Sequence, residues 1–182
     1  MGDCHLASGS DDINDKLVTA GAIEEVIKAL RAFPGNAKVV EHGCNAIINL
    51  ASGNDIKDKL FAVGAVDEVI KALRAFPENA DIVKFGCMAI VNLASGSNDR
   101  KDKLVTAGAI EEVIKALRAF PGNADIVRQG CWAIGNLAAG SNDRKSKVVA
   151  TGAKPLLEAA LNNTTLTQAA RDQAKNALGK LV

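Results

Sequence analysis

An asparagine recurs at one position of a repeated phrase, while the residues around it change. The phrase reads GCNAIINL at 43–50, GCMAIVNL at 86–93 and GCWAIGNL at 130–137, and its asparagines are Asn49, Asn92 and Asn136. A side-chain amide offers a donor and an acceptor, the two groups that a peptide backbone also presents. A row of such amides would hold an extended peptide whatever its sequence.

Variable side chains surround these asparagines. At about 100° per residue, the most variable positions of each predicted helix fall on one side, with the asparagine in the middle of it. We predict that this side binds a peptide and that the variable residues select its side chains. The candidate binding residues are Asn49, Asn92, Asn136, Trp132, Met88, Asn45, Phe85, His42, Gln129, Asp81 and Asp125. Two other interpretations stay open: neutral drift of a solvated face, and a structural hydrogen bond from the asparagine to a neighbouring repeat.

Trp132 is the only tryptophan of the chain and lies four residues before Asn136. An exposed indole stacks on lysine or arginine, for about 0.5–2 kcal/mol. Asp125 lies earlier on the same side and would take the positive charge, as Asp81 would beside Met88 and Phe85. We therefore expect a basic or amphipathic extended segment. Packing of Trp132 between repeats is the alternative.

The expected spacing suits this hypothesis. Neighbouring helices pack about 8–10 Å apart and an extended chain advances about 3.3 Å per residue, so each repeat would face roughly two to three peptide residues. Each hydrogen bond contributes about 0.5–1.5 kcal/mol, so the asparagines alone cannot give tight binding. Trp132 would have to act as the anchor.

The elements that carry these residues repeat along the chain, so the chain is a tandem array. Glycines 21, 64, 108 and 152 open the same phrase, so the repeat is 43 or 44 residues long, as in helical repeat proteins. Residues 15–37 recur letter for letter at 102–124. So long an identical copy indicates a recent duplication or an engineered array.

Each unit is expected to contain three helices. In the third unit, polar residues 97–99 offer N-caps for a first helix that ends at Gly108. The second helix carries an apolar stripe and ends at the Pro-Gly-Asn break of 121–123, and the third spans about 124–138. No unit can bury its stripe alone, so stacked units must share one core.

One side of the third helix is nearly unchanged between copies, which predicts a packed core. Glycine costs about 1 kcal/mol relative to alanine in a helix, so its repetition there indicates a close neighbouring helix. The core positions of the first copy are Val40, Gly43, Cys44, Ile47, Leu50 and Ala51, and the corresponding glycines are Gly86 and Gly130.

We expect a single solenoid over 1–182. The predicted division is a partial repeat or N-terminal cap at 1–10, repeats at 11–53, 54–97 and 98–141, and a C-terminal capping repeat at 142–182. The cap is indicated by Lys154 and Pro155 in place of the usual Ile-Glu, and by Lys180 in place of the asparagine.

The chain resembles the armadillo-repeat family over essentially its whole length. The three-helix unit, the GAI opening, the Pro-Gly-Asn break and GCWAIGNLA, with Trp132 and Asn136 four apart, carry the resemblance. It implies an all-α fold, a right-handed superhelical solenoid of three-helix armadillo repeats. In that family, importin-α holds extended basic peptides with tryptophan and asparagine pairs, and β-catenin binds acidic partners. Only Trp132 and Asn136 reproduce the full pair.

Composition excludes several classes of function. The chain has 182 residues with a formal net charge of +1, and its basic and acidic residues alternate, so we expect neither nucleic acid nor a membrane as partner. It lacks a signal-peptide pattern and any apolar run that could span a bilayer. We expect a cytoplasmic or nuclear protein, or a recombinant one if the array is engineered.

The inventory of reactive residues argues against an enzyme. There are two histidines, no tyrosine, no phosphate-binding glycine loop and no zinc-ligand spacing, so we predict no catalytic residue, no metal and no cofactor. The cysteines at 44, 87 and 131 recur in register and should be reduced and buried. The acids of the second helices, Glu24-Glu25, Asp67-Glu68 and Glu111-Glu112, should form a solvated face.

Two functions from different classes remain. The first is a protein-interaction scaffold that binds an extended peptide along the third helices. The second is an engineered or excised repeat scaffold without an evolved ligand, whose repeats serve folding and stability. An apolar groove that contains Phe85, Met88 and Trp132 would also favour self-association.

Overall fold

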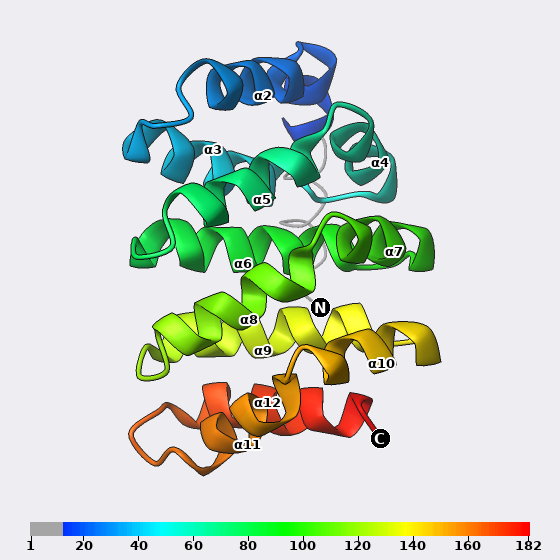
Figure 1. Cartoon of the computed structure of the whole chain (residues 1–182). Helices are drawn as coiled ribbons and strands as arrows, with labels where there is room; N and C mark the ends of the chain where they lie inside the picture. The colour runs from blue at the N-terminus through cyan, green and yellow to red at the C-terminus, as the bar shows by residue number, and fades with distance from the viewer. Residues whose placement is uncertain (1–12) are drawn as a thin grey trace, which may run out of the picture.

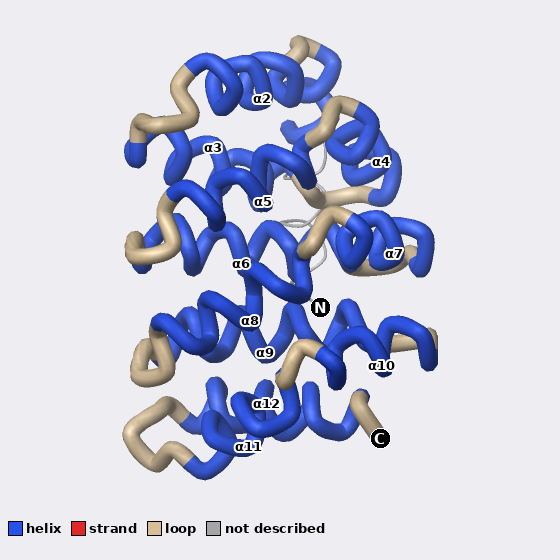
Figure 2. Tube along the Cα trace, in the orientation of Figure 1, coloured by secondary structure: helices blue, strands red, loops and turns tan. Residues whose placement is uncertain are grey.

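The computed structural model describes residues 13–182, and these form a stack of helices without strands (Figures 1 and 2). The first unit contains a helix at 13–19, α2 (Ala22–Ala32) and α3 (Ala37–Leu50). The next units contain α4 (Asn54–Ala62), α5 (Ala65–Ala75) and α6 (Ala80–Ala94), then α7 (Asn98–Thr106), α8 (Ala109–Ala119) and α9 (Ala124–Ala138). The last unit contains α10 (Asn142–Ala150), α11 (Ala153–Asn162) and α12 (Gln168–Lys180). The expected partial repeat at 1–10 lies outside the described residues.

Corresponding helices of successive units lie above one another, which makes the molecule a solenoid (Figure 1). The second helices α2, α5, α8 and α11 form one layer, and the third helices α3, α6, α9 and α12 form another behind it. Each third helix packs against the third helix of the next unit. The all-α solenoid predicted from the repeats is therefore confirmed.

The predicted breaks between helices have the expected geometry. Asn36, Asn79 and Asn123 cap the third helices, and each side-chain oxygen accepts hydrogen bonds from two backbone N–H groups of the first turn. Gly64 and Gly108 join the first and second helices with φ of 85° and 92°. A positive φ of this size favours glycine, which explains why every unit opens on one.

The predicted core side of the third helix is buried. Cys44 and Ile47 have no exposed surface, and Val40, Leu50 and Ala51 are also buried. A Cβ on Gly43 would lie 2.5 Å from Leu30 Cδ2, and one on Gly86 would lie 2.6 Å from Leu73 Cδ2. The close approach inferred from the glycines is thus confirmed, and the neighbour is a leucine of the second helix in the same unit.

The acids of the second helices are not a solvated face, and that prediction was wrong at Glu68 and Glu112. Their exposed fractions are 5% and 4%. Glu112 Oε1 accepts hydrogen bonds from Arg74 Nε of the preceding unit at 2.8 Å and from Lys115 Nζ at 3.1 Å. Glu68 is bound in the same way by Arg31 and Lys71. The stacked preceding unit covers one acid in the second and third pairs, an effect that the pattern of a single helix does not contain.

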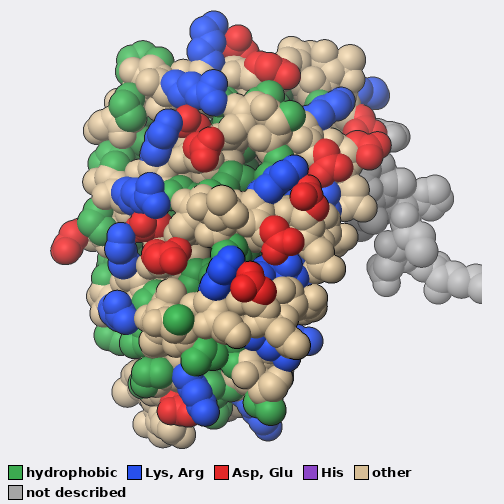
Figure 3. Space-filling model, turned by 45° about the vertical axis from the view of Figure 1, so that its right-hand side comes forward, with side chains coloured by type: hydrophobic (Ala, Val, Ile, Leu, Met, Phe, Trp, Pro, Cys, Tyr) green, Lys and Arg blue, Asp and Glu red, His purple; other side chains and the backbone are tan. Residues whose placement is uncertain are grey.

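Charges of both signs are interspersed over the outer surface (Figure 3). Intra-helical pairs such as Lys103–Asp99 at 2.8 Å and Lys147–Asp143 at 2.9 Å contribute to this mixture. In the part of the chain that the structure describes, no helix combines the length and the apolar character needed to cross a membrane.

Gly86→Ala should lower the free energy of unfolding by about 1–2 kcal/mol. The new methyl group must displace Leu73, and overpacking of a core costs about 1–3 kcal/mol, against a gain of up to about 1 kcal/mol in helix propensity. Gly179→Ala in α12 is the matched control, because nothing lies within 4 Å of its added Cβ. Urea denaturation should show stabilisation of the control only. Equal stabilisation of both variants would refute the packing role of Gly86.

Glu112→Gln should destabilise the protein by about 1–2 kcal/mol, since it removes charge-assisted hydrogen bonds that join two units. Glu25 occupies the same position in the first unit but is exposed. Glu25→Gln should therefore leave the unfolding midpoint nearly unchanged. The prediction fails if both substitutions shift the thermal midpoint equally.

Candidate functional site

The three asparagines lie near the C-terminal ends of stacked third helices, so the structure places them in one row. Asn49 of α3 is exposed, and Asn92 of α6 and Asn136 of α9 are half-buried. The row thus faces solvent, and its second and third members are more buried than its first. This arrangement is the one that the peptide-binding hypothesis requires.

The hydrogen bonds of the three amides differ. Asn92 Nδ2 donates to the backbone oxygen of Ile48 in the preceding unit at 3.2 Å, so the structural role that we left open applies to this residue. Within residues 13–182, the side chains of Asn49 and Asn136 form no hydrogen bond. Within the described residues, two of the three amides therefore have no partner for either of their polar atoms.

Trp132 is exposed, with 41% of its surface accessible to solvent. It lies one helical turn before Asn136 on α9, so the two side chains share one side of the helix. Packing of Trp132 between repeats, the alternative interpretation, explains why part of its surface is covered. It does not explain the exposed part of the indole. The exposed indole next to an unpaired amide is the feature that most resembles a binding site in this layer.

Gln129 must be removed from the candidate residues, because only 5% of its surface is exposed. Helix α9 packs between α6 and α12, and these neighbours cover the position. Helix α3 has α6 on one side, and its corresponding residue His42 remains exposed. Variation between copies therefore reflects packing between units at this position, and not contact with a ligand.

The acid at the start of α6 is already paired. Lys84 Nζ lies 2.9 Å from Asp81 Oδ1 and 4.7 Å from the ring centroid of Phe85. A peptide cation would have to displace Lys84 from both partners. Asp125 is exposed and forms no ion pair within the described residues, so the predicted cation site is intact only near Trp132. Met88 and Asn45 are half-buried along the same layer.

Sequence reasoning missed a second row of polar residues, which lies on the first helices. Asn14, Lys57, Lys101 and Lys145 are spaced 43 or 44 residues apart, so the repeat register itself was the signal. Each donates a hydrogen bond to the C-terminal end of the third helix in its own unit. The acceptors are Asn49 O at 3.0 Å, Ser95 Oγ at 2.7 Å, Ala139 O at 3.5 Å and Val182 O at 2.7 Å.

Two buried arginines, also missed, tie successive first helices together. Arg144 Nη1 donates to Asp102 Oδ1 at 2.6 Å, and Arg144 Nη2 donates to Asn98 Oδ1 at 2.9 Å. Arg100 binds Asp58 and Asn54 in the same way one unit earlier. Asp58 and Asp102 are thus each bound by an arginine of the next unit.

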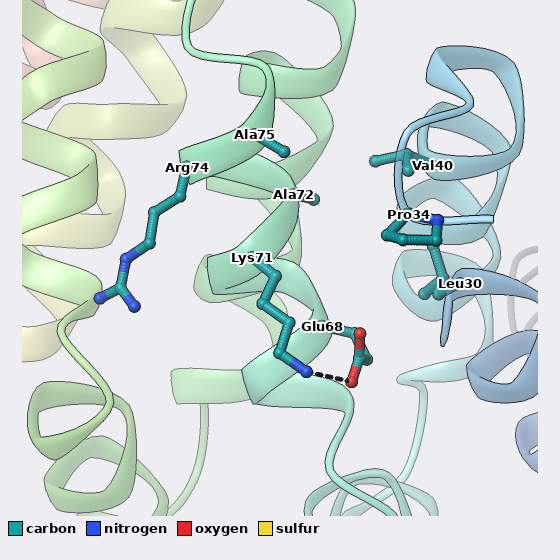
Figure 4. Close-up of a pocket in the computed structure, with 8 residues that line it drawn as sticks. All are labelled: Leu30, Pro34, Val40, Glu68, Lys71, Ala72, Arg74 and Ala75. Carbon is teal, nitrogen blue, oxygen red and sulfur yellow. Dashed lines mark hydrogen bonds and ion pairs between the residues drawn. The ribbon is translucent and has the colours of Figure 1, made fainter. Parts of the chain in front are cut away.

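Clefts also lie in the second-helix layer, away from the asparagines. A cleft of about 380 Å³ separates α2 and α3 from α5 and is lined by Leu30, Pro34 and Val40 on one side and by Ala72 on the other (Figure 4). Figure 4 shows Lys71 reaching Glu68 at its edge, while Arg74 points away from it. The lining of this gap between units is mostly apolar, and its charged residues Glu68 and Lys71 pair with each other.

The cysteines behave as small apolar residues, as predicted. Cys44, Cys87 and Cys131 are free and buried, and burial raises the pKa of each thiol to about 12. Such thiols are protonated at neutral pH and therefore poor nucleophiles. Within residues 13–182, no group of three or more possible metal-ligating side chains is present.

Comparison with solved structures identifies the fold. A computationally designed armadillo repeat protein for modular peptide recognition is 28% identical, with a TM-score of 0.80 over 92% of this chain and 67% of its own. The chain has the fold of an armadillo repeat solenoid. An engineered protein at 24% identity superposes with a TM-score of 0.86 over 96% of this chain and 69% of its own.

A third armadillo-like structure was solved with a ligand. This designed armadillo repeat protein, in complex with the peptide (KR)4, is 25% identical and covers 98% of this chain and 89% of its own, with a TM-score of 0.59. No protein-family model and no curated protein matches the chain. The armadillo resemblance that the repeated phrases indicated is therefore supported by structure alone.

Cysteine ionisation predicts that stability falls at alkaline pH. The pKa of Cys87 rises on folding from 9.0 to about 12, so its contribution is complete below pH 9 and is lost as the pH rises toward 12. Removing it by Cys87→Ala should make the free energy of unfolding fall less steeply with pH, by about 1.4 kcal/mol per pH unit. Urea denaturation under reducing conditions between about pH 8 and about pH 11 measures this slope. A slope equal to that of the parent protein would contradict the assignment.

Proposed function

We propose that this protein is a non-enzymatic interaction scaffold that binds an extended peptide along its third helices. The observation that carries the proposal is the exposed Trp132 beside Asn136, whose amide forms no hydrogen bond within the described residues. Asn49 offers a second such amide at the other end of the row. Together these groups would hold a peptide backbone at two points and one side chain beside Asn136.

The expected ligand places a basic side chain against Trp132. The indole offers a face for a lysine or arginine, and Asp125 offers a carboxylate without a described partner. The armadillo-like proteins named above, one designed for peptide recognition and one solved with (KR)4, support this choice of ligand class. Asn92 is expected to contribute less, because binding a peptide would compete with its bond to Ile48.

A second candidate is favoured by the 23-residue segment 15–37, which recurs without change at 102–124. Such a copy is typical of an engineered array, in which the repeats serve folding and stability and no ligand has been selected. In that case a peptide screen should enrich no sequence. Self-association through Phe85, Met88 and Trp132 is a further outcome, and light scattering would detect it as a doubled mass.

Peptide binding is tested with an acetylated, amidated (KR)4 peptide carrying a fluorophore. Anisotropy titration should show binding by the parent protein. Asn136→Ala should weaken it about three- to tenfold, the effect of one or two lost hydrogen bonds, and Trp132→Ala by about tenfold. Asn162→Ala, at the exposed end of α11 in the other layer, is the matched control and should bind as the parent does.

Circular dichroism verifies that each variant is folded. Equal binding of (KR)4 by the parent and both site variants would overturn the proposal. Asn136→Ala is chosen over Asn92→Ala because its side chain forms no described hydrogen bond, so its loss should not disturb the stack.

A further inference from the structure

The C-terminal ends of the third helices carry a row of amino groups beside the row of asparagines. Lys57 Nζ donates to Ser95 Oγ at 2.7 Å, and Ser95 Oγ donates in turn to the backbone oxygen of Asn92 at 2.7 Å. Lys101 Nζ reaches Ala139, which follows Asn136 by three residues. The lysines therefore border the proposed peptide site on the side away from Trp132.

At the third unit, this border holds more positive charge than its neighbours neutralise. Burial lowers the pKa of Lys101, and the charges of Arg144 and Lys180 lower it further. Asp102 opposes this effect but is already bound to Arg144. Lys180 stands in α12 at the position that the asparagine occupies in the other third helices, so it continues the row. Lys101 is thus bound at the C-terminal end of α9, Lys180 lies at the C-terminal end of the adjacent α12, and neither forms an ion pair within the described residues.

The residues before Asn136 along α9 and those after it differ in chemical character. Trp132 lies four residues before Asn136, and Ala139 with its bound Lys101 lies three residues after it. Successive side chains of an extended peptide point to opposite sides. If Asn136 holds the backbone, one side chain faces Trp132 and Asp125, and the next faces Lys101 and Lys180.

We propose that the bound segment carries a carboxylate directly next to the residue that faces Trp132, and that Lys101 and Lys180 bind this carboxylate. This inference rests on the proposed peptide-binding function and refines its ligand from a basic segment to one in which basic and acidic residues alternate. Lys101 is half-buried and held by Ala139, so it is positioned before the ligand arrives. Lys180 is exposed and closes on the carboxylate from the capping unit.

A double-mutant cycle between peptide and protein tests the inference. The probes are labelled, acetylated and amidated (KE)4 and (KQ)4, which differ only in the charge of alternate residues. The parent should bind (KE)4 about three- to tenfold more tightly than (KQ)4 in low salt, as expected for partly buried ion pairs. The variant with Lys101→Gln and Lys180→Gln should lose this preference while its affinity for (KQ)4 stays within about twofold.

Lys175→Gln is the matched control, because Lys175 is exposed on the same helix as Lys180 but about 140° away around its axis. This control should keep the preference for (KE)4. Equal binding of the two peptides by the parent, or a preference that survives in the double variant, would overturn the carboxylate site and leave the proposed function standing. Failure of both peptides and of (KR)4 to bind would overturn the proposed function itself.

Discussion

The close contact between a glycine of the third helix and a leucine of the second helix sets the geometry of every unit. A Cβ at Gly43, Gly86 or Gly130 would lie 2.5 to 2.8 Å from that leucine, so the two helices approach nearer than any other residue would allow. This contact defines which side of the third helix faces inward. Because the helix turns by about 100° per residue, it also defines which side carries the asparagine.

Polar contacts between units then align one third helix with the next. Glu112 and Arg144 are buried and bind partners in the preceding unit, and their equivalents one repeat earlier do the same. Buried charged groups tolerate few alternative packings, because an unpaired partner costs several kcal/mol. The glutamate contacts join the first three units, and the arginine contacts join the last three, so every junction holds at least one such contact that fixes the offset between units. A constant offset is what turns isolated asparagines into a row.

The resulting face has two unlike borders. Toward the start of α9 lie an exposed indole and the carboxylate of Asp125, and toward its end lie Lys101 and Lys180. The lysine row has a structural origin, since Asn14 performs the same helix-end contact without a charge. Replacing that amide by lysine in later units adds positive charge beside the asparagines. A contact that stabilises the fold thereby also influences which ligand the face prefers.

Much of the fold followed from the sequence by itself, because its signals are local: glycine at positive φ, asparagine caps and apolar periodicity act within one turn of helix. The repeat length and the buried cysteines followed from the recurrence of the same residues at a fixed spacing. Burial of Gln129, Glu68 and Glu112 was decided only in the tertiary structure. Whether a residue is buried depends on the unit stacked against it, and the residue pattern of a single helix carries no information about that neighbouring unit.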